Sequence, residues 1–308
     1  MPVTTNVSIT IPLHNKAPWI DRAIRSVLDQ TATAWELVVV DDGSTDDGPQ
    51  RVAAWGDHRV RLLRQPQAGP GAARNQGLRE SHGERVAFLD ADDEWRPTFL
   101  ERTAAVLDAQ PRAVAAFSNL VDALEDRPLL KHVSVRNGLV ENYFEAWIAN
   151  RGFGMSASST LVRRVPFLEC GAFPEDRMHG EDLDAWGRLA LTGPVAYVPE
   201  PLVVYHRRLP GSLSAQSRDR VSREPPFVST YRTWARAGRI PPALSRSCRR
   251  YAAFQLASLA REQLHGRARA AALRSLGQAL LLAPTAAFVL SAYARLPLAG
   301  RVRPLLGR

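Results

Sequence analysis

The sequence predicts an α/β protein with a mostly parallel sheet flanked by helices, followed by an α-helical region. Short β-rich runs alternate with helical patterns over the first 120 residues, as in chains whose parallel strands are joined by crossover helices. Acidic clusters follow two of these runs directly, at the sheet edge where open α/β sheets bind ligands. Residues 225–308 are rich in Ala, Leu and Arg with helical periodicity. We therefore expect two domains, residues 1–215 and 216–308.

Strand candidates are β-branched or apolar runs bounded by turn residues, and helix candidates carry apolar residues on one face. Pro12 is expected to end the first strand, and the acidic turn at Asp41 to stop the second. Paired prolines break the C-terminal pattern into separate helices. Strands are expected at residues 7–11, 36–40, 59–63, 85–89, 113–121, 156–162 and 195–205, and helices at residues 19–28, 72–81, 97–110 and 179–191.

Charge is divided unevenly along the chain. The 308 residues carry 40 Lys+Arg against 31 Asp+Glu, a net charge of +9, and the 45% hydrophobic content excludes a disordered chain. Residues 1–206 hold 21 basic against 28 acidic residues, net −7, whereas residues 207–308 hold 19 against 3, net +16. An acidic domain with a basic appendage and no nucleic-acid-binding motif predicts no nucleic acid partner.

Cysteines and targeting signals favour a cytoplasmic protein. Cys170 and Cys248 show neither metal-ligand spacing nor a disulfide framework, which suits a reducing compartment. The N-terminus has no basic segment followed by a long apolar run, so no secretory signal is expected. Residues 275–294 are uncharged and about as long as a membrane span, but their small residues and Pro284 favour a surface-lying or core helix. A membrane span stays an alternative.

Asp90, Ala91 and Asp92 follow the fourth expected strand. Residues i and i+2 of a strand point to the same side, so the two carboxylates can converge on one cation, or on a cation and a ribose. Oxygen ligands suit Mn²⁺ or Mg²⁺, which also bind phosphate oxygens. The sequence thus predicts a metal–diphosphate site, although helix capping by Asp92 and Asp93 explains the same residues.

Two further motifs each have a functional and a structural interpretation. Asp41 and Asp42 either form a simple turn or present a carboxylate to a nucleotide base or ribose. The glycine-rich run from Gly69 through Gly71 to Asn75 precedes a helix, where backbone N–H groups can face an anion. A tight entry into that helix explains the glycines equally well.

The second half of the chain holds the remaining candidates. Glu181 and Asp182 begin a helix. Either the helix dipole alone accounts for acidic residues at this position, or one of the two carboxylates acts as a general base. Adjacent residues point in different directions, so we expect only one to reach substrate. His206, Arg207 and Arg208 follow an extended run and can bring positive charge to phosphate oxygens, although a lone His is more often structural.

Taken together, five motifs resemble, in order and spacing, family 2 glycosyltransferases with the GT-A fold. They lie at residues 7–15, 35–46, 67–93, 171–188 and 205–214, so the likeness covers roughly residues 5–215. The resemblance implies a Rossmann-like sheet of the GT-A type. It also implies an inverting hexosyl- or hexosaminyltransferase that moves a sugar from a nucleoside-diphosphate sugar, UDP-linked, to an acceptor hydroxyl on a saccharide or lipid-linked glycan.

The resemblance also implies roles for individual residues. Asp42 resembles the aspartate that reads uracil, Asp90 the ribose contact, Asp92 the metal ligand of the DxD motif, and Asp182 the catalytic base. His14 departs from the family, which usually has Tyr there. The candidate catalytic residues are therefore Asp182 and Glu181, the metal ligands Asp92, Asp90 and His206, and the donor-binding residues Pro12, His14, Asn15, Asp41, Asp42, Gly71, Asn75, Asp90, Ala91, Asp92, His206, Arg207 and Arg208.

Two other functions compete with transfer. A non-catalytic nucleotide-sugar or carbohydrate-binding protein of the same fold would lack the base or the metal ligand, yet both aspartates are present. A sugar nucleotidyltransferase would carry an N-terminal glycine-rich signature with a basic residue, which this sequence lacks. The basic C-terminal region is expected to lie against anionic lipid at the inner face of the plasma membrane or against acceptor phosphates, with a solvated face or a homodimer contact as alternatives.

Overall fold

The computed structural model describes residues 7–123, 127–128, 138–150, 155–206, 209 and 223–286. Its strands are β1 (Val7–Leu13), β2 (Trp35–Asp42), β3 (Val60–Gln65), β4 (Arg85–Phe88), β5 (Glu94–Trp95), β6 (Ala115–Asp122), β7 (Arg127–Pro128), β8 (Leu139–Val140), β9 (Thr160–Arg163) and β10 (Val195–Tyr205). Its α-helices are α1 (Ala17–Leu28), α2 (Gly48–Ala53), α3 (Pro70–Arg79), α4 (Phe99–Ala109), α5 (Tyr143–Ala149), α6 (Arg164–Glu169), α7 (Glu181–Leu189), α9 (Pro226–Arg236), α10 (Pro242–His265) and α11 (Arg269–Leu282).

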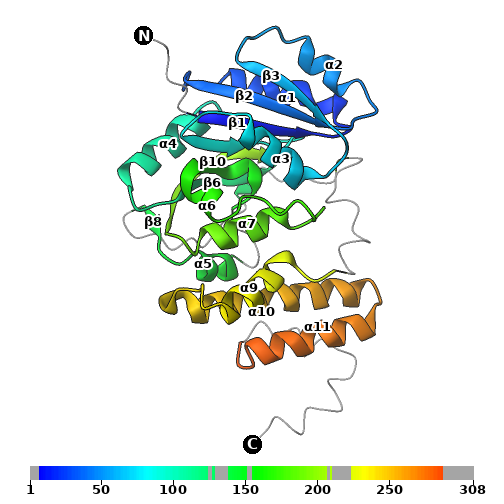
Figure 1. Cartoon of the computed structure of the whole chain (residues 1–308), viewed down its shortest axis with the longest axis vertical. Helices are drawn as coiled ribbons and strands as arrows, with labels where there is room; N and C mark the ends of the chain where they lie inside the picture. The colour runs from blue at the N-terminus through cyan, green and yellow to red at the C-terminus, as the bar shows by residue number, and fades with distance from the viewer. Residues whose placement is uncertain are drawn as a thin grey trace, which may run out of the picture.

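One large sheet organises the first two thirds of the chain (Figure 1). Its order is β3-β2-β1-β4-β9-β6-β10-β5, with β7 beside β6 and β8 beside β10. Strands β3, β2, β1 and β4 are parallel, as are β6 and β10, whereas β9 runs antiparallel between β4 and β6. The predicted α/β class with a mostly parallel sheet is confirmed.

Alternating side chains of the strands feed a separate core on each face of the sheet. On one face, Ile9 and Leu37 pack with Ile24 of α1 and Leu107 of α4. On the other face, Phe88 meets aromatic side chains of α6 and α7 in a cluster of tilted and edge-on rings. The helices on both faces therefore fix the carboxyl ends of the strands, where the acidic residues lie.

Two expectations about local structure are wrong. Pro12 lies inside β1, opposite Val40, and does not end the strand. The neighbouring strand β4 reaches only as far as Thr10, so nothing on that side of Pro12 requires an N–H group. The expected strand at residues 156–162 begins instead with a 3-10 turn, Ala157–Ser159, before β9. Helices α2, α5 and α6 and the two-residue strands were not expected from periodicity.

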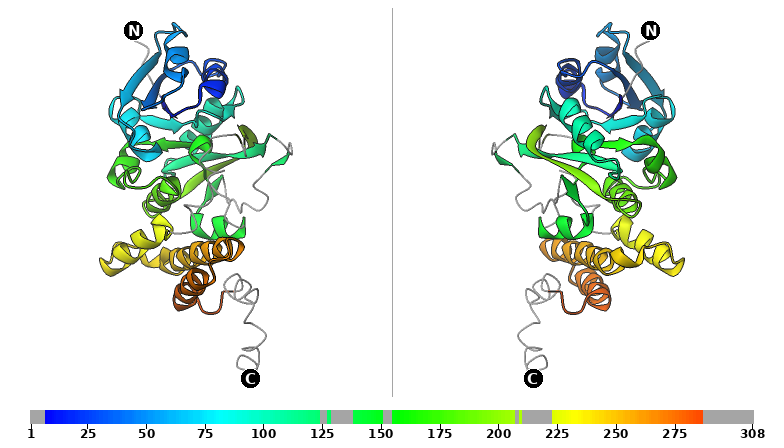
Figure 2. Two further views of the ribbon diagram at one scale, coloured as in Figure 1. Left: turned by 90° about the vertical axis from the view of Figure 1, so that its right-hand side faces the viewer. Right: turned by 90° about the vertical axis from the view of Figure 1, so that its left-hand side faces the viewer.

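The C-terminal helices form a layer at the end of the molecule remote from β2 and β3 (Figure 2). Phe227 of α9 and Tyr251 of α10 belong to the same core as Phe88, so this layer shares its apolar packing with the sheet. The Thr230 hydroxyl of α9 also donates a 2.6 Å hydrogen bond to Asp184 of α7. Residues 210–222, which include the predicted boundary, lie outside the described residues, and the division into two domains stays a prediction.

Helix α11 includes residues 275–282 of the uncharged stretch 275–294. Its Ala272, Leu276 and Ala279 are buried against α10. Residues 283–286 follow the helix, and residues 287–294 lie outside the described part. Among the described helices, none combines the length and apolarity that crossing a membrane requires. Cys170 and Cys248 are both free and buried.

Gly187 of α7 lies against α9, and Gly277 of α11 is an exposed glycine that serves as its control. A Cβ atom on Gly187 would lie 2.3 Å from ring carbons of Phe227, whereas one on Gly277 of α11 would meet nothing within 4 Å. We expect Gly187→Ala to destabilise the protein by about 1–3 kcal/mol through overpacking. Gly277→Ala should stabilise it by about 0.5–1 kcal/mol because Ala has the higher helix propensity. Urea unfolding midpoints measure both, and equal midpoints for the two variants would contradict this packing.

Candidate functional site

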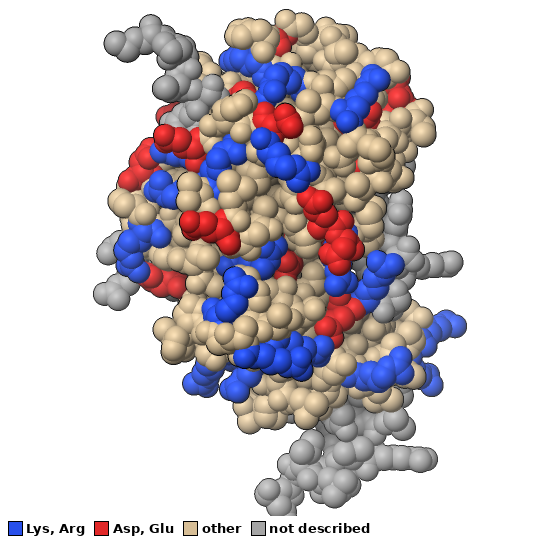
Figure 3. Space-filling model, in the orientation of Figure 1, with Lys and Arg blue, Asp and Glu red and all other residues tan. Residues whose placement is uncertain are grey.

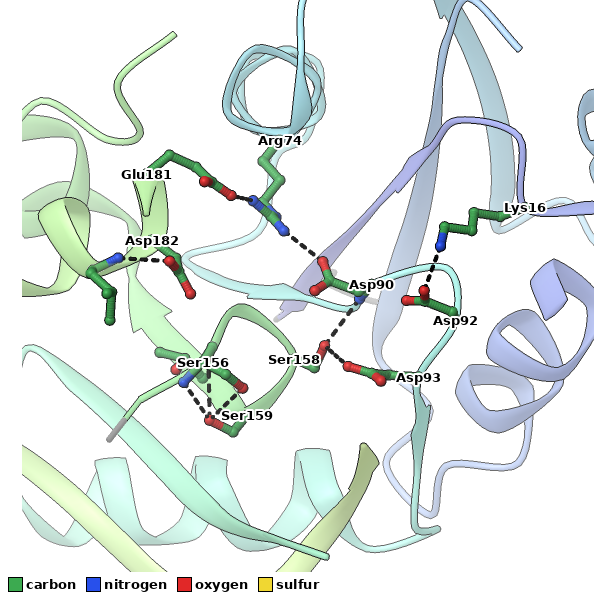
Figure 4. Close-up of polar contacts among 12 residues, drawn as sticks. Lys16, Arg74, Asp90, Asp92, Asp93, Ser156, Ser158, Ser159, Glu181 and Asp182 are labelled. Carbon is green, nitrogen blue, oxygen red and sulfur yellow. Dashed lines mark hydrogen bonds and ion pairs between the residues drawn. The ribbon is translucent and has the colours of Figure 1, made fainter. Parts of the chain in front are cut away.

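The acidic residues after β4 form a tight turn. The strand ends at Phe88, and the Asp93 N–H donates to the Asp90 carbonyl oxygen at 3.0 Å. The expectation that Asp90 and Asp92 share one side of a strand is therefore wrong, because the backbone reverses between them. Each carboxylate instead meets a cation of its own, Arg74 or Lys16 (Figure 4).

Arg74 of α3 joins this acidic turn to the start of α7. Its guanidinium donates to Glu181 Oε1 at 2.8 Å and to Asp90 Oδ1 at 2.5 Å, and only 5% of its side chain is exposed. Burial alone lowers the pKa of Arg74, but the two carboxylates raise it above its usual value, so the side chain is a fixed cation. Arg74 was not among the residues expected from the sequence. A charged residue four positions before Leu78, on the buried face of the helix, was the signal that could have indicated it.

Asp182 stands beside this bridge at the first turn of α7. Gly180 precedes the helix with a φ of +74°, and the Leu183 N–H donates to Asp182 Oδ1 at 2.8 Å. Burial, followed by the charge of Glu181, raises the pKa of Asp182 to about 7, against the opposing effect of Arg74. Glu181 is buried and committed to Arg74. Of the pair, Asp182 is therefore the carboxylate suited to exchange a proton near neutral pH.

Two buried tyrosines lie within the electrostatic reach of Asp182. Tyr143 comes from α5 and Tyr251 from α10, with ring centroids 6.0 Å apart in an edge-on arrangement. Burial, with a further contribution from the Asp182 charge, raises the pKa of both phenols above the usual range. The C-terminal helices thus border the surroundings of the candidate base, a connection that the sequence did not indicate.

Lys16 and Arg22 hold the acidic turn from the side of α1. Lys16 Nζ lies 2.6 Å from Asp92 Oδ2, and Arg22 donates to the Asp92 carbonyl oxygen at 2.6 Å. The Lys16 ammonium also lies 5.1 Å from the ring centroid of Trp19. Asp92 is therefore held through both its carboxylate and its carbonyl oxygen.

Asp93 has a structural role, although not the helix cap that was an alternative for it. Its carboxylate accepts hydrogen bonds from the Ser158 hydroxyl at 2.6 Å and from the His206 N–H at 3.1 Å. Burial, then the neighbouring charges of Asp90 and Asp92, raises the pKa of Asp93 well above its usual value. The His206 imidazole lies 2.9 Å from Glu94 and makes no contact with Asp90 or Asp92. Arg207 and Arg208 lie outside the described residues.

The glycine-rich loop before α3 does face an anion, and that anion is Asp42. The backbone N–H groups of Ala68 and Gly69 each donate to the Asp42 carboxylate at 2.8 Å, and Gln65 donates from its side chain at 2.7 Å. Asp42 is also buried. The Asp42 carboxylate therefore fixes the loop that borders the predicted binding site for the nucleotide base.

The loop after β1 is built around His14 and Asn15. His14 Nδ1 lies 2.9 Å from the Asp42 carbonyl oxygen, which requires a proton on Nδ1 and leaves Nε2 to accept from Gln67. Asn15, with a φ of +51°, accepts from the Thr45 N–H at 2.8 Å. Asp41 accepts from the Ser44 N–H at 2.9 Å in a local turn. These residues lie beside one another where β1 and β2 end.

Gly71 and Asn75 serve the packing of α3. A Cβ atom on Gly71 would lie 2.4 Å from the Pro174 carbonyl oxygen, so only glycine permits this approach. The Asn75 amide donates to the Phe173 carbonyl oxygen at 2.8 Å and accepts from the Phe173 N–H at 3.1 Å. Both residues bind the loop before α7 to α3, and their contacts are internal.

The residues present fit a divalent cation held jointly with a ligand. Among the described side chains, no group of three or more His, Cys, Asp or Glu could hold a metal ion unaided. Asp92 nevertheless offers carboxylate oxygens and already faces a cationic nitrogen. A hard cation that completes its shell with phosphate oxygens suits such an incomplete oxygen site.

Comparison with known proteins agrees with this geometry. A family model described as glycosyl transferase family 2 matches residues 8–167, just over half of the chain. The chain belongs to this family. The uncharacterized glycosyltransferase RC0461 of Rickettsia conorii is 29% identical over 200 residues, which make up 64% of this chain and 32% of that protein. The succinoglycan biosynthesis protein ExoO of Rhizobium meliloti is 41% identical over 125 residues, 40% of this chain and 36% of ExoO.

Solved structures show the same fold for this family 2 chain. TarS of S. aureus, in complex with UDP-GlcNAc, superposes with a TM-score of 0.65 at 17% identity, covering 90% of this chain and 81% of TarS. The mannosyltransferase PcManGT of Pyrobaculum calidifontis, in complex with GDP-Man and Mn²⁺, gives 0.63 at 21% identity and 98% and 81% coverage. The predicted GT-A fold is confirmed. The chain spans about a third of the length of the two curated relatives above.

The raised pKa of Asp182 predicts a stability effect that depends on pH. Its value of about 7 in the folded chain exceeds the ordinary 3.8, so folding favours the protonated acid and stability falls as pH rises between these values. Asp182→Asn removes this cost. We expect the variant to melt about 2–4 °C above the wild type at pH 8, with a smaller difference at pH 5. Thermal unfolding followed by circular dichroism measures both, and a larger gain at pH 5 would be incompatible with a raised pKa.

Proposed function

We propose that this chain is an inverting glycosyltransferase that moves a hexose or hexosamine from a UDP-linked sugar to a hydroxyl of a saccharide or lipid-linked glycan. The single observation that carries the proposal is the Arg74 bridge, which joins the DxD turn to the Glu181–Asp182 pair. Family membership supports sugar transfer as the reaction. UDP as the carrier rests on two similar proteins, TarS in complex with UDP-GlcNAc and the glucosyltransferase WfgD of Escherichia coli, whose name specifies UDP-Glc.

In the proposed reaction, Asp182 removes the proton from the acceptor hydroxyl as the new bond to the anomeric carbon forms. A carboxylate with a pKa of about 7 is a stronger base than an ordinary aspartate and is still ionised in about half of the molecules at neutral pH. Glu181 does not compete for this role, because Arg74 holds it. One base acting on one face gives inversion, without a second carboxylate as nucleophile.

The donor diphosphate is proposed to lie at the acidic turn. Asp92 would hold Mn²⁺ or Mg²⁺ there, and the bound ion would neutralise charge on the leaving group. Asp90 and His206 are proposed as further ligands, for which they would leave their present partners Arg74 and Glu94. Asp90 is proposed to contact the ribose. His206, together with Arg207 or Arg208, is proposed to contact the phosphates. The nucleotide base and ribose would meet Pro12, His14, Asn15, Asp41 and Asp42. The family resemblance adds Gly71, Asn75 and Ala91 to the proposed donor-binding residues.

Asp182→Asn tests the base directly. We expect release of UDP from UDP-glucose or UDP-GlcNAc, with Mn²⁺ and a saccharide acceptor, to fall by at least about 100-fold, because general base catalysis contributes about 10²–10⁴. UDP binding should persist. Asp176→Asn is the matched control, since this exposed carboxylate lies before α7 and forms an ion pair with Arg177 alone among the described residues. Retained turnover in Asp182→Asn would exclude Asp182 as the base. In the wild type, kcat/KM should rise as the pH increases through about 7, because the ionised form of Asp182 is the base.

The acceptor side of the proposal places the basic helices against anionic lipid. Residues 223–286 hold eleven arginines against two glutamates, and Figure 3 shows Lys and Arg side chains gathered over this end of the molecule. Leu273 and Leu281, eight residues apart on one face of α11, are 43% and 86% exposed. Exposed apolar residues flanked by arginines suit a helix lying on an anionic membrane surface. WfgD supports a lipid-linked acceptor, since its name specifies a diphosphoundecaprenol substrate.

Co-sedimentation with vesicles tests the lipid contact. The full chain should bind phosphatidylglycerol vesicles and not phosphatidylcholine vesicles, and Leu273→Glu with Leu281→Glu should weaken binding by about tenfold or more because two apolar anchors become acidic. Val165→Glu with Leu168→Glu is the matched control, as these α6 residues are also exposed, by 63% and 49%. Equal loss in both double variants would exclude α11 as the contact. A second copy of the chain as the occupant would appear as a dimer in sedimentation velocity without vesicles.

A further inference from the structure

Lys16 pairs with the carboxylate that the proposed function assigns to a divalent cation. We propose that Lys16 is a built-in competitor of that cation: its ammonium neutralises Asp92 in the free protein and moves to the donor diphosphate when the metal binds. The inference rests on the proposed function for the identity of the diphosphate. Its consequence is that metal and nucleotide bind this protein interdependently.

Arg22 and Lys16 contact different parts of Asp92, the backbone and the carboxylate. Arg22, from the second turn of α1, donates to the Asp92 carbonyl oxygen at 2.6 Å and thereby fixes the backbone of the turn. Lys16, at the N-terminal cap of the same helix, contacts the carboxylate itself, with Nζ 2.6 Å from Oδ2. A structural tie between α1 and the acidic turn therefore exists without Lys16. The Lys16 contact adds charge neutralisation at the atoms that a metal requires.

Lys16 is also the cation of this turn that can leave. Arg74 is shared between two carboxylates and buried between α3 and α7, so its departure would leave Glu181 uncompensated. Lys16 carries its charge on a flexible four-carbon stem, and Asp92 is its one ion-pair partner among the described residues. The side chains of Lys16 and Asp92 are 13% and 16% exposed, so the pair touches solvent. An exchange at Asp92 thus requires only a rotation of the lysine stem.

Competition for one carboxylate predicts weak metal binding by the free protein. A divalent cation and an ammonium on the same carboxylate repel each other, so the metal must displace Lys16 and carry the cost of breaking the pair. A diphosphate bound beside the turn offers the displaced ammonium new anionic oxygens. By linkage, nucleotide must then raise metal affinity, and metal must raise nucleotide affinity by the same factor.

The test is a titration of the full chain with Mn²⁺, with free Mn²⁺ measured by electron paramagnetic resonance and with neither nucleotide nor acceptor present. We expect Lys16→Gln to bind Mn²⁺ at least about 5-fold more tightly than the wild type, within the usual range of coupling energies. Adding UDP should raise Mn²⁺ affinity strongly in the wild type and less in the variant. Lys16→Met, which keeps the aliphatic stem near Trp19, should behave like Lys16→Gln.

Two controls make the result specific. Arg25→Gln removes the same charge from the same helix, but Arg25 lies over Trp55, and this variant should bind Mn²⁺ as the wild type does. In an Asp92→Asn background, Lys16→Gln should have no effect. Unchanged or weaker Mn²⁺ binding by both folded Lys16 variants would overturn the proposal, as would an equal gain in Arg25→Gln. Because no sugar transfer enters the titration, an inactive transferase would leave this outcome unaffected and would instead contradict the proposed function.

Discussion

The buried guanidinium of Arg74 is the interaction on which the site depends. It brings together a turn after the fourth strand and the start of a helix more than ninety residues later, each through one carboxylate. A cation in this position is tolerated because carboxylates lie within hydrogen-bond distance of it, and its removal would leave the charge of Glu181 uncompensated in the interior. Loop, helix and turn therefore take their relative positions from electrostatics as much as from apolar packing.

The same arrangement divides the acidic residues by task. Arg74 pairs with Glu181 and Asp90. Asp93 accepts hydrogen bonds from Ser158 and from the His206 N–H, and Asp42 accepts them from the loop before α3. Asp182 forms no ion pair among the described residues, and Asp92 pairs with Lys16, which can leave it. Most of the negative charge of the site thus maintains its shape, which preorganises Asp182 and Asp92, the proposed base and the proposed metal ligand.

Much of the fold was predictable from the sequence, because β-branched runs and helical periodicity are local signals. Residues 195–205 were expected to be extended, and β10 has these bounds. The site was less predictable, because its geometry comes from long-range contacts. Asp90 and Asp92 do not share one side of a strand, because the backbone turns after Phe88. Arg74 was not predicted because its partners are distant in sequence. The glycine-rich loop had two interpretations, anion binding or a tight helix entry, and its N–H groups bind Asp42 of the chain itself.

Helix α10 is buried on two sides, and this has a consequence for how related chains diverge. Its Cys248 and Tyr251 pack into the core that contains Trp186, while Leu256 and Ala260 pack against α11. Transplanting the C-terminal helices from a relative would therefore require matching substitutions in α5 and α7, and cutting them away would expose an aromatic surface prone to aggregation. Sequence change in the C-terminal helices is constrained to occur in concert with the aromatic residues that they contact.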